Sequence, residues 1–113
     1  MGGCPDKAVR AEAALWLAKF RYNRREWKES GRLFTECAGA FSGDRKAEAL
    51  LWAARAAFAD NDFKLAIQTS TRVAEEHAGS PLRLQALLLQ GEALMELARF
   101  DEAVLVLERV SSA

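Results

Sequence analysis

The chain has 113 residues, and its 16 basic and 16 acidic side chains leave a formal net charge of zero. This balance argues against a dedicated nucleic-acid binder, which carries a strongly basic surface, and a hydrophobic content of 50% argues against a disordered protein. We expect a disordered leader at residues 1–6 and a single domain at residues 7–113. No apolar run is long enough to span a bilayer, so the sequence predicts a soluble protein of the cytoplasm or the bacterial periplasm.

Helical periodicity continues from the start of this domain to its end. Small and apolar residues recur three and four positions apart, which places them on one face of an α-helix. Alanine, the strongest helix former, dominates residues 47–59, so the helix there is expected to be buried on most sides. The sequence predicts helices over residues 7–24, 27–41, 44–60, 63–78, 81–98 and 100–111.

Turn residues separate the predicted helices. Gly43 is expected to end one helix and Asp44 to cap the next. Pro81 is expected in a first helical turn, where its missing N–H has no partner to lose. Asn61 and Asp62 favour a tight turn, so the chain is expected to reverse direction between the two helices that flank them.

A pattern of large and small residues repeats three times along the chain. The aromatic residues Trp27, Phe63 and Phe100 lie 36 and 37 positions apart. The same shifts align further apolar and small residues: Leu15, Leu51 and Leu88; Trp16, Trp52 and Leu89; Ala18, Ala54 and Gly91; Ser30, Ala66 and Ala103. A period between about 20 and 50 residues indicates a stacked array, so the sequence predicts an all-α, right-handed stack of three antiparallel helix hairpins. The three units are expected at residues 7–43, 44–80 and 81–113.

Each hairpin is expected to close on one large and one small side chain. The aromatic residue begins the second helix of the unit and fills the gap beside the first helix. The small residue three positions later lets the two backbones approach, because added bulk at such a crossing destabilises the fold by about 1–3 kcal/mol.

The segment LLLQGEALMELARFDEAVLVLERV, Leu87 to Val110, resembles the tetratricopeptide repeat, whose signature runs W-x-x-L-G-x-x-Y, then Ala and Phe. Gly91 and Ala103 stand at the family's small positions. The first unit is less similar, since Ser30 replaces the family's alanine. The units are two or three residues longer than the family's usual length of about 34, and a long second helix ending in a Gly-Ser-Pro turn resembles the repeats of bacterial cell-envelope assembly proteins. The resemblance implies an all-α superhelical solenoid.

The resemblance also implies a concave groove, lined by the first helix of each unit, that binds a protein or peptide partner. The residues expected there form an apolar ladder with charged residues between its rungs: Leu15, Leu51, Leu88, Tyr22, Phe58, Met95, Lys19, Arg55 and Glu92. Such a ladder suits an amphipathic helix or an extended apolar peptide. It does not suit the family's clamp for chaperone C-terminal carboxylates, which relies on Lys and Asn where Leu15 and Leu51 stand. The alternative is that these side chains simply pack between neighbouring helices.

The last predicted helix has a second apolar side. Its sequence AVLVL is apolar all round, whereas repeat arrays normally finish with a polar outer face. We therefore expect Val104, Leu105 and part of Val106 to be covered, either by a second copy or by further repeats of a longer chain. Residues 1–46 carry ten basic and six acidic side chains and residues 81–113 carry three and five, which favours head-to-tail contact, although drift on a solvated surface gives the same pattern. The alternative function is thus a self-associating structural module without a separate ligand.

No catalytic residue, metal site or cofactor is predicted. Cys4 and Cys37 have no metal-binding or redox spacing; Cys37 fits a helix core, and Cys4 is either a plain exposed thiol or an acylated one. His77 is the only histidine, and we interpret it as a surface residue near a helix C-terminus, since no orienting carboxylate accompanies it. Basic and aromatic residues mix in residues 19–32, which we interpret as a solvated face and not as a nucleic-acid site. The sequence therefore predicts a protein that is not an enzyme.

Overall fold

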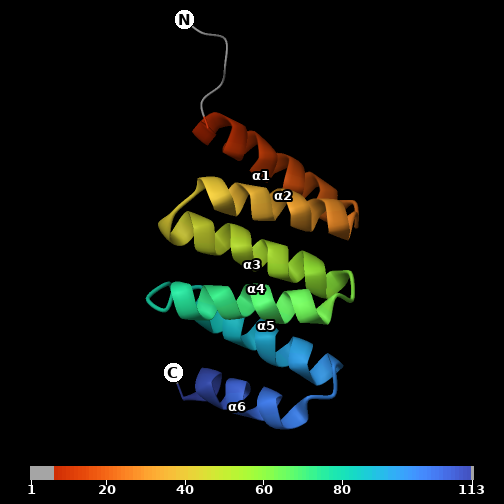
Figure 1. The fold of residues 1–113 in the computed structure, drawn as a ribbon, viewed down its shortest axis with the longest axis vertical. Coiled ribbons are helices and arrows are strands. Elements are labelled where there is room, and N and C mark those ends of the chain that lie inside the picture. Colours follow the sequence, from red (N-terminus) through yellow and green to blue (C-terminus); the bar gives the residue numbers. More distant parts are fainter. Residues whose placement is uncertain (1–6, 113) are drawn as a thin grey trace, which may run out of the picture.

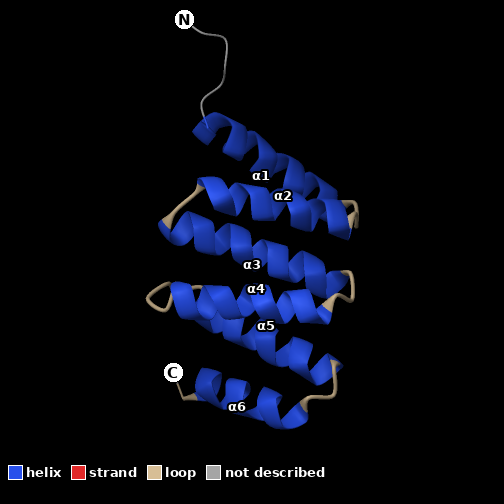
Figure 2. Ribbon diagram, viewed as in Figure 1, coloured by secondary structure: helices blue, strands red, loops and turns tan. Residues whose placement is uncertain are grey.

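The computed structural model describes residues 7–112, which form a stack of α-helices (Figure 1). The helices are α1 (Lys7–Asn23), α2 (Trp27–Ala40), α3 (Gly43–Ala59), α4 (Phe63–Glu76), α5 (Arg83–Glu96) and α6 (Phe100–Ser111). Figure 2 shows these helices joined by short loops, with no strand in the described part of the chain. The predicted leader, residues 1–6, and Cys4 lie outside the described residues.

Each helix packs against the next one in the sequence, and α3 also contacts α5. Figure 1 shows the consequence, a stack that runs from the N-terminal to the C-terminal helix in chain order. The stack is elongated, with extents of 57 × 29 × 17 Å. The prediction of an all-α solenoid built from three helix hairpins, α1–α2, α3–α4 and α5–α6, is confirmed.

The small residues that the repeat aligns lie at the crossing of the two helices of each hairpin. Ala66 and Ala103 have no exposed surface, and a Cβ added to Gly91 would lie 2.6 Å from Cδ2 of Leu107. Ser30, which departs from the family's alanine, is equally buried, and its hydroxyl donates a hydrogen bond of 2.9 Å to the carbonyl of Ala18. The serine is therefore tolerated because its one buried donor has a partner on the facing helix.

The three hairpins share one turn. Its left-handed residue is Arg25 (φ 64°), Asn61 (φ 64°) or Ala98 (φ 60°), each two positions before the aromatic residue that begins the second helix. The following amide donates to the carbonyl five residues earlier in each case: Glu26 to Arg21 at 3.0 Å, Asp62 to Ala57 at 2.8 Å and Arg99 to Leu94 at 2.9 Å. This pattern is the Schellman motif, which satisfies the last carbonyls of the first helix. The first unit, whose sequence departs most from the repeat, thus has the same turn as the other two.

Ala98 occupies its left-handed conformation at a cost that glycine would not incur. We expect Ala98→Gly to raise the free energy of unfolding by about 1 kcal/mol, since a Cβ is disfavoured at positive φ. Ala13→Gly, on an exposed position inside α1, should lower it by a similar amount. Chemical denaturation followed by circular dichroism measures both changes, and a loss of stability from Ala98→Gly would contradict the turn geometry.

The loops between the units differ from the prediction in three places. Gly43 does not end α2 but begins α3, with φ of 61°, and the N-cap residue is Ser42 rather than Asp44. Pro81 lies before α5, which starts at Arg83, because the Ser80 hydroxyl accepts the amide hydrogen of Leu82 at 3.1 Å and closes a turn there.

The extra residues of the longer repeat also lie in this turn. Helix α4 ends at Glu76, so residues 77–82 form the connection to α5 and do not extend the helix as predicted. The tight turn predicted at Asn61 and Asp62 is confirmed, and the Asp62 carboxylate caps α4 by accepting the amide hydrogen of Leu65 at 3.3 Å.

An aromatic cluster forms the joint between the first and second units. The Trp52 ring of α3 lies 5.1 Å from that of Tyr22, edge to face, and 5.7 Å from that of Phe34, nearly parallel. Phe34 is completely buried. The second unit therefore docks by inserting a tryptophan between side chains from both helices of the first unit.

Cys37 belongs to the same core, as predicted. Its side chain is 1% exposed, and the thiol donates to the carbonyl of Ala11 at 3.5 Å. Burial raises the pKa of this thiol, which keeps it protonated and unreactive in the folded protein.

Candidate protein-binding surfaces

The structure overturns part of the predicted apolar ladder. Leu15 and Leu51 are only 7% and 2% exposed, because the following unit covers each of them. Both are core residues, so a ligand has no access to them in the folded protein. Leu88, at the same position of the last unit, is 46% exposed.

The second row of the ladder behaves in the same way. Tyr22 is half-buried between the rings of Trp27, at 4.9 Å, and Trp52. Phe58 is half-buried against the ring of Phe63 at 5.2 Å. Met95, in the last unit, is 45% exposed. For the first two units, the alternative that these side chains pack between helices is the one that the structure supports.

The charged residues predicted for the groove lie on the surface but differ in their contacts. Arg55 is half-buried, lies over the Trp52 ring at 5.2 Å and donates to Oε1 of Gln85 at 2.8 Å. Lys19 lies over the Trp16 ring at 5.9 Å, and Glu92 is exposed. The Arg55 contact links α3 to α5, so this residue braces two units and is only partly available to a ligand.

Four of the exposed apolar residues of the last unit stand at positions that are buried or half-buried in the other units, and we call these four the tail surface. It consists of Leu84, Leu88 and Met95 on α5 and Val104 on α6, which are 41%, 46%, 45% and 51% exposed. The equivalent residues are buried or half-buried in the first unit (Ala11, Leu15, Tyr22 and Gly31) and in the second (Ala47, Leu51, Phe58 and Ile67). In the first and second units, the following unit therefore covers the surface that is equivalent to the tail surface.

A second apolar surface lies at the opposite end of the stack, and we call it the head surface. Trp16, Leu17 and Phe20 of α1 are 72%, 42% and 52% exposed. Their equivalents are buried or half-buried against the preceding unit in α3 (Trp52, Ala53 and Ala56) and in α5 (Leu89, Gln90 and Ala93). We did not predict this surface, although the alignment of Trp16 with Trp52 and Leu89 was the signal that marks it.

The apolar run of α6 is exposed only in part. Val104 and Leu105 are 51% and 65% exposed, but Val106 is 8% exposed and packs in the core of its own unit, so the expectation that Val106 is partly available is wrong. Leu105 aligns with Arg32 and Gln68, which are exposed although a further unit follows them. Leu105 therefore faces the outer side of the stack and not the joint.

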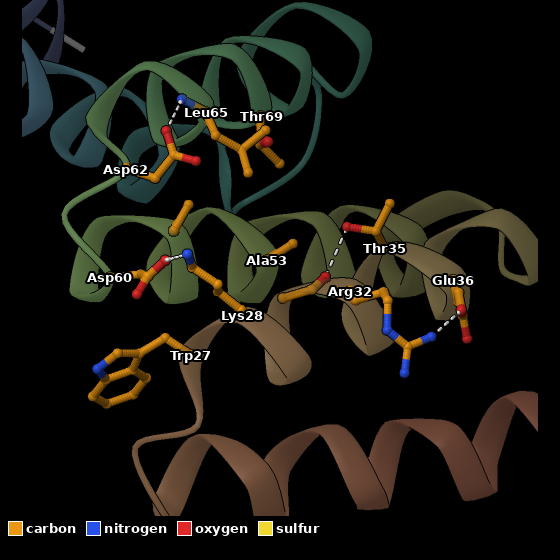
Figure 3. A pocket seen from close by; sticks show the side chains of 12 residues that line it. Trp27, Lys28, Arg32, Thr35, Glu36, Ala53, Asp60, Asp62, Leu65 and Thr69 are labelled. Atoms are coloured by element: carbon orange, nitrogen blue, oxygen red, sulfur yellow. Dashed lines mark hydrogen bonds and ion pairs between the residues drawn. The ribbon is translucent and has the colours of Figure 1, made fainter.

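A pocket of about 410 Å³ lies on the outer side of the stack, between α2 and α4 (Figure 3). Its lining includes Gly31 from α2, Ala53 from α3 and Leu65 from α4. Lys28 and Asp60, whose charged atoms are 4.0 Å apart, lie at its rim. Its volume is within the range of small-ligand pockets, and the residues that line it include no nucleophile paired with a base.

The pocket exists because small residues meet at this joint. The repeat places Ile67 where the first unit has Gly31, and Leu94 where the second has Ala57. At the next joint these larger side chains pack into the core clusters and fill the corresponding space. The repeat period is the same at both joints, so the period alone does not predict which of them has a pocket.

Several of the basic residues in the segment considered for nucleic-acid binding form ion pairs within the protein. Hydrogen bonds from Arg21, at 2.6 Å, and Arg24, at 3.0 Å, lower the pKa of Glu26, and Arg32 pairs with Glu29 and Glu36. The basic charge of residues 19–32 is thus partly neutralised by neighbouring carboxylates.

His77 is half-buried rather than on the surface as predicted. It follows the last residue of α4, and its Nε2 is enclosed without a hydrogen-bond partner among the described residues. Within residues 7–112, no three His, Cys, Asp or Glu side chains are grouped so as to hold a metal ion, and no helix is long and apolar enough to cross a membrane.

The comparison with protein families identifies the repeat. The family model of the tetratricopeptide repeat matches residues 48–80 and 85–112, which together are more than half of the chain. The chain belongs to the tetratricopeptide-repeat family. Tetratricopeptide repeats generally mediate protein–protein interactions. The match covers the second and third hairpins, and it does not test the resemblance to the cell-envelope assembly type, which stays a prediction. A search of curated proteins finds no match.

Proposed function

We propose that this tetratricopeptide-repeat protein is an interaction scaffold that binds an amphipathic helix of a protein partner on its tail surface. The observation that supports it is the use of the equivalent surfaces inside the chain. Helix α3 packs on α2, and its Trp52 ring contacts that of Tyr22 on α1; α5 packs on α4 and also contacts α3. A surface of this shape accepts the apolar face of an α-helix, and the third unit presents one with large side chains exposed.

In this proposal the partner binds only at the third unit, and not along the groove that was predicted to run over all three units. Leu88 and Met95 were part of the predicted ladder and remain accessible, whereas Leu15 and Leu51 do not. Burying a fully exposed side chain of this kind contributes about 1.5–3 kcal/mol, and Leu88 and Met95, which are 46% and 45% exposed, have roughly half of that left to contribute. A cluster of such residues is what anchors a typical interface.

The charges beside the tail surface restrict the partner further. Glu92 and Glu96 on α5 and Asp101 on α6 are all exposed. Charges at the rim of an interface steer association and reject partners of like charge. We therefore expect the bound helix to carry basic residues along the edges of its apolar face.

The test uses helical peptides selected for binding to the unmodified chain from a display library. We expect Leu88→Asp to weaken their binding at least about tenfold, because it places a charge in the centre of the surface. Leu65→Asp is the matched control, since Leu65 is 47% exposed and lines the outer pocket. Titration calorimetry measures both affinities, with circular dichroism to confirm that each variant is folded. Peptides that tolerate Leu88→Asp and lose binding with Leu65→Asp would move the binding site to the pocket and reject the proposal.

A further inference from the structure

We infer that the partner on the tail surface is the head surface of a second copy of this chain, so that copies join head to tail in the register of the joints found within each copy. This inference rests on the proposed function, because it names the occupant of the same surface. Three independent features of the two ends support it: an aromatic anchor, complementary apolar positions and a reversed charge pair.

The anchor is Trp16, which stands at the same repeat position as Trp52. Within the chain, Trp52 inserts between Tyr22 and Phe34 of the preceding unit. Trp16 has no such neighbour in the described part of the chain and is 72% exposed, the most exposed of the large hydrophobic residues described. An exposed tryptophan that fits a repeated socket is the kind of residue that dominates binding energy in interfaces.

The socket for Trp16 is present at the other end. The repeat places Met95 and Leu107 where the first unit has Tyr22 and Phe34. Met95 is 45% exposed and Leu107 is half-buried. In a head-to-tail pair, Trp16 of one copy would lie between Met95 and Leu107 of the other, as Trp52 does within the chain. Methionine adapts well to an aromatic partner, with a sulfur–ring contact as a further gain.

A second pair of positions defines how closely the copies approach. Inside the chain, a Cβ on Gly31 would lie 3.6 Å from Cβ of Ala56, an ordinary van der Waals contact between two small residues. The corresponding pair between copies is Val104 and Phe20, which are 51% and 52% exposed. Val104 corresponds to Ile67 at the second internal joint, but Phe20 stands where both internal joints have alanine, Ala56 and Ala93. Its ring therefore has to turn aside or hold the copies further apart than the internal units.

The charges at the two ends also match, with their signs exchanged. Lys28 of the first unit lies 4.0 Å from Asp60 of the second. The repeat shifts of 36 and 37 residues place Asp101 at the position of Lys28, and Arg24 at the position of Asp60. A head-to-tail joint therefore brings Asp101 of one copy to Arg24 of the next, whose Nε also donates to Glu26 of its own chain at 3.0 Å. The same register brings Glu92 to Glu12, a pair of like charge, and Arg45 already pairs with Glu12 at 2.6 Å within its own chain.

Head-to-tail contact uses two different surfaces, so it leaves one of each free on every dimer and allows the assembly to grow. We expect the weight-average mass of the unmodified chain to rise continuously with concentration in sedimentation equilibrium. Trp16→Asp blocks the head surface and Leu88→Asp blocks the tail surface, and each variant alone should be monomeric, with association weakened at least about tenfold. Both residues are exposed, so both variants should keep the helical circular dichroism of the parent.

The deciding experiment mixes these two variants in equal amounts. The free tail of Trp16→Asp and the free head of Leu88→Asp can still join, so the mixture should form a dimer and stop there. A parent chain that is monomeric at every concentration would overturn the inference. So would a parent that associates while the mixture stays monomeric, because that result requires a symmetric contact.

The charge pair tests the register of the joint. Asp101→Arg and Arg24→Asp should each weaken association about threefold, the effect expected for an exposed ion pair. The double variant should associate as strongly as the parent, since every joint then again brings one acidic and one basic side chain together. Failure of the combination to restore association would contradict the register. Asp44→Arg, an equal charge change in the middle unit, is the control and should have no effect.

The inference and the proposed function fail in different ways. Trp16→Asp should abolish self-association and keep the binding of selected helical peptides, because the tail surface is intact. Apparent peptide affinity should rise at concentrations where the parent associates, since a second copy no longer competes for that surface. If peptides bind the parent chain at the tail surface and the parent never associates, the proposed function stands and the second copy is not the partner. If the parent associates head to tail but no helical peptide binds, the scaffold function is rejected and the alternative, a self-associating module, is the one that remains.

Discussion

Replacing Phe34 by alanine should lower the free energy of unfolding by about 3–5 kcal/mol, the range measured for deletion of a buried aromatic ring. Phe34 is completely buried, and its ring is stacked on that of Trp52 at a centroid distance of 5.7 Å. The substitution would leave a cavity at the joint between the first two units, where both helices of the first unit meet α3.

Denaturation by urea measures this loss, and Phe20→Ala is a suitable control. Phe20 is 52% exposed on the head surface, so its replacement should change the free energy of unfolding by about 0.5 kcal/mol or less. The double variant of Phe34 and Trp52 should lose less than the sum of the single variants, because the two rings contact each other. Equal effects of Phe34→Ala and Phe20→Ala would show that the first hairpin does not pack on the second as described.

Replacing Ala103 by tryptophan should be the most damaging change in the last unit. Ala103 has no exposed surface at the crossing of α5 and α6, and a bulky residue there has to push the two helices apart. Such overpacking typically destabilises a protein by about 1–3 kcal/mol, and the large increase in volume here favours the upper end.

The matched control is Glu108→Trp, which adds the same side chain to an exposed position of α6. Differential scanning calorimetry should show a marked fall in Tm for Ala103→Trp and little change for Glu108→Trp. Ala66→Trp should reproduce the effect in the second unit, where the equivalent alanine is also fully buried. If Ala103→Trp melts at the temperature of the parent, the register proposed for the hairpins is wrong.

The hairpins could be predicted from the sequence because their closure depends on local, repeated features. The small residue of the pattern is buried in each unit, as Ala66 is, but the large one fills the gap as predicted only where it is half-buried, as at Phe63; Phe100 of the last unit is 53% exposed. Helix periodicity and turn residues point to the same boundaries, and this agreement between levels is what specifies a fold. Every observed helix accordingly begins and ends within two residues of its predicted bounds.

The candidate site could be predicted much less well, because exposure depends on the neighbouring unit and not on the residue itself. Leu15, Leu51 and Leu88 occupy one repeat position and are 7%, 2% and 46% exposed. Only the last lacks a following unit within the described residues. The repeat period gives the position of a residue on its helix, but the packing of whole units decides whether that position is core or surface.

The same reasoning explains why the head surface and the outer pocket were not predicted. Trp16 looks like a core residue when it is aligned with Trp52, and only the arrangement of the stack shows that α1 has an uncovered side. The pocket depends on the absence of a side chain at Gly31, where the next unit has Ile67. A volume difference across a joint leaves no mark on hydrophobic periodicity.

The most direct test of the account is the position of a bound helix, followed by the methyl NMR spectra of leucine and valine residues. A selected helical peptide should shift the methyl signals of Leu84, Leu88 and Val104, which are 41%, 46% and 51% exposed on the tail surface. The signals of Leu65, on the outer side, should stay in place. Shifts confined to Leu65 and its neighbours, with the tail-surface methyl groups unchanged, would contradict the claim that the third unit presents the binding surface.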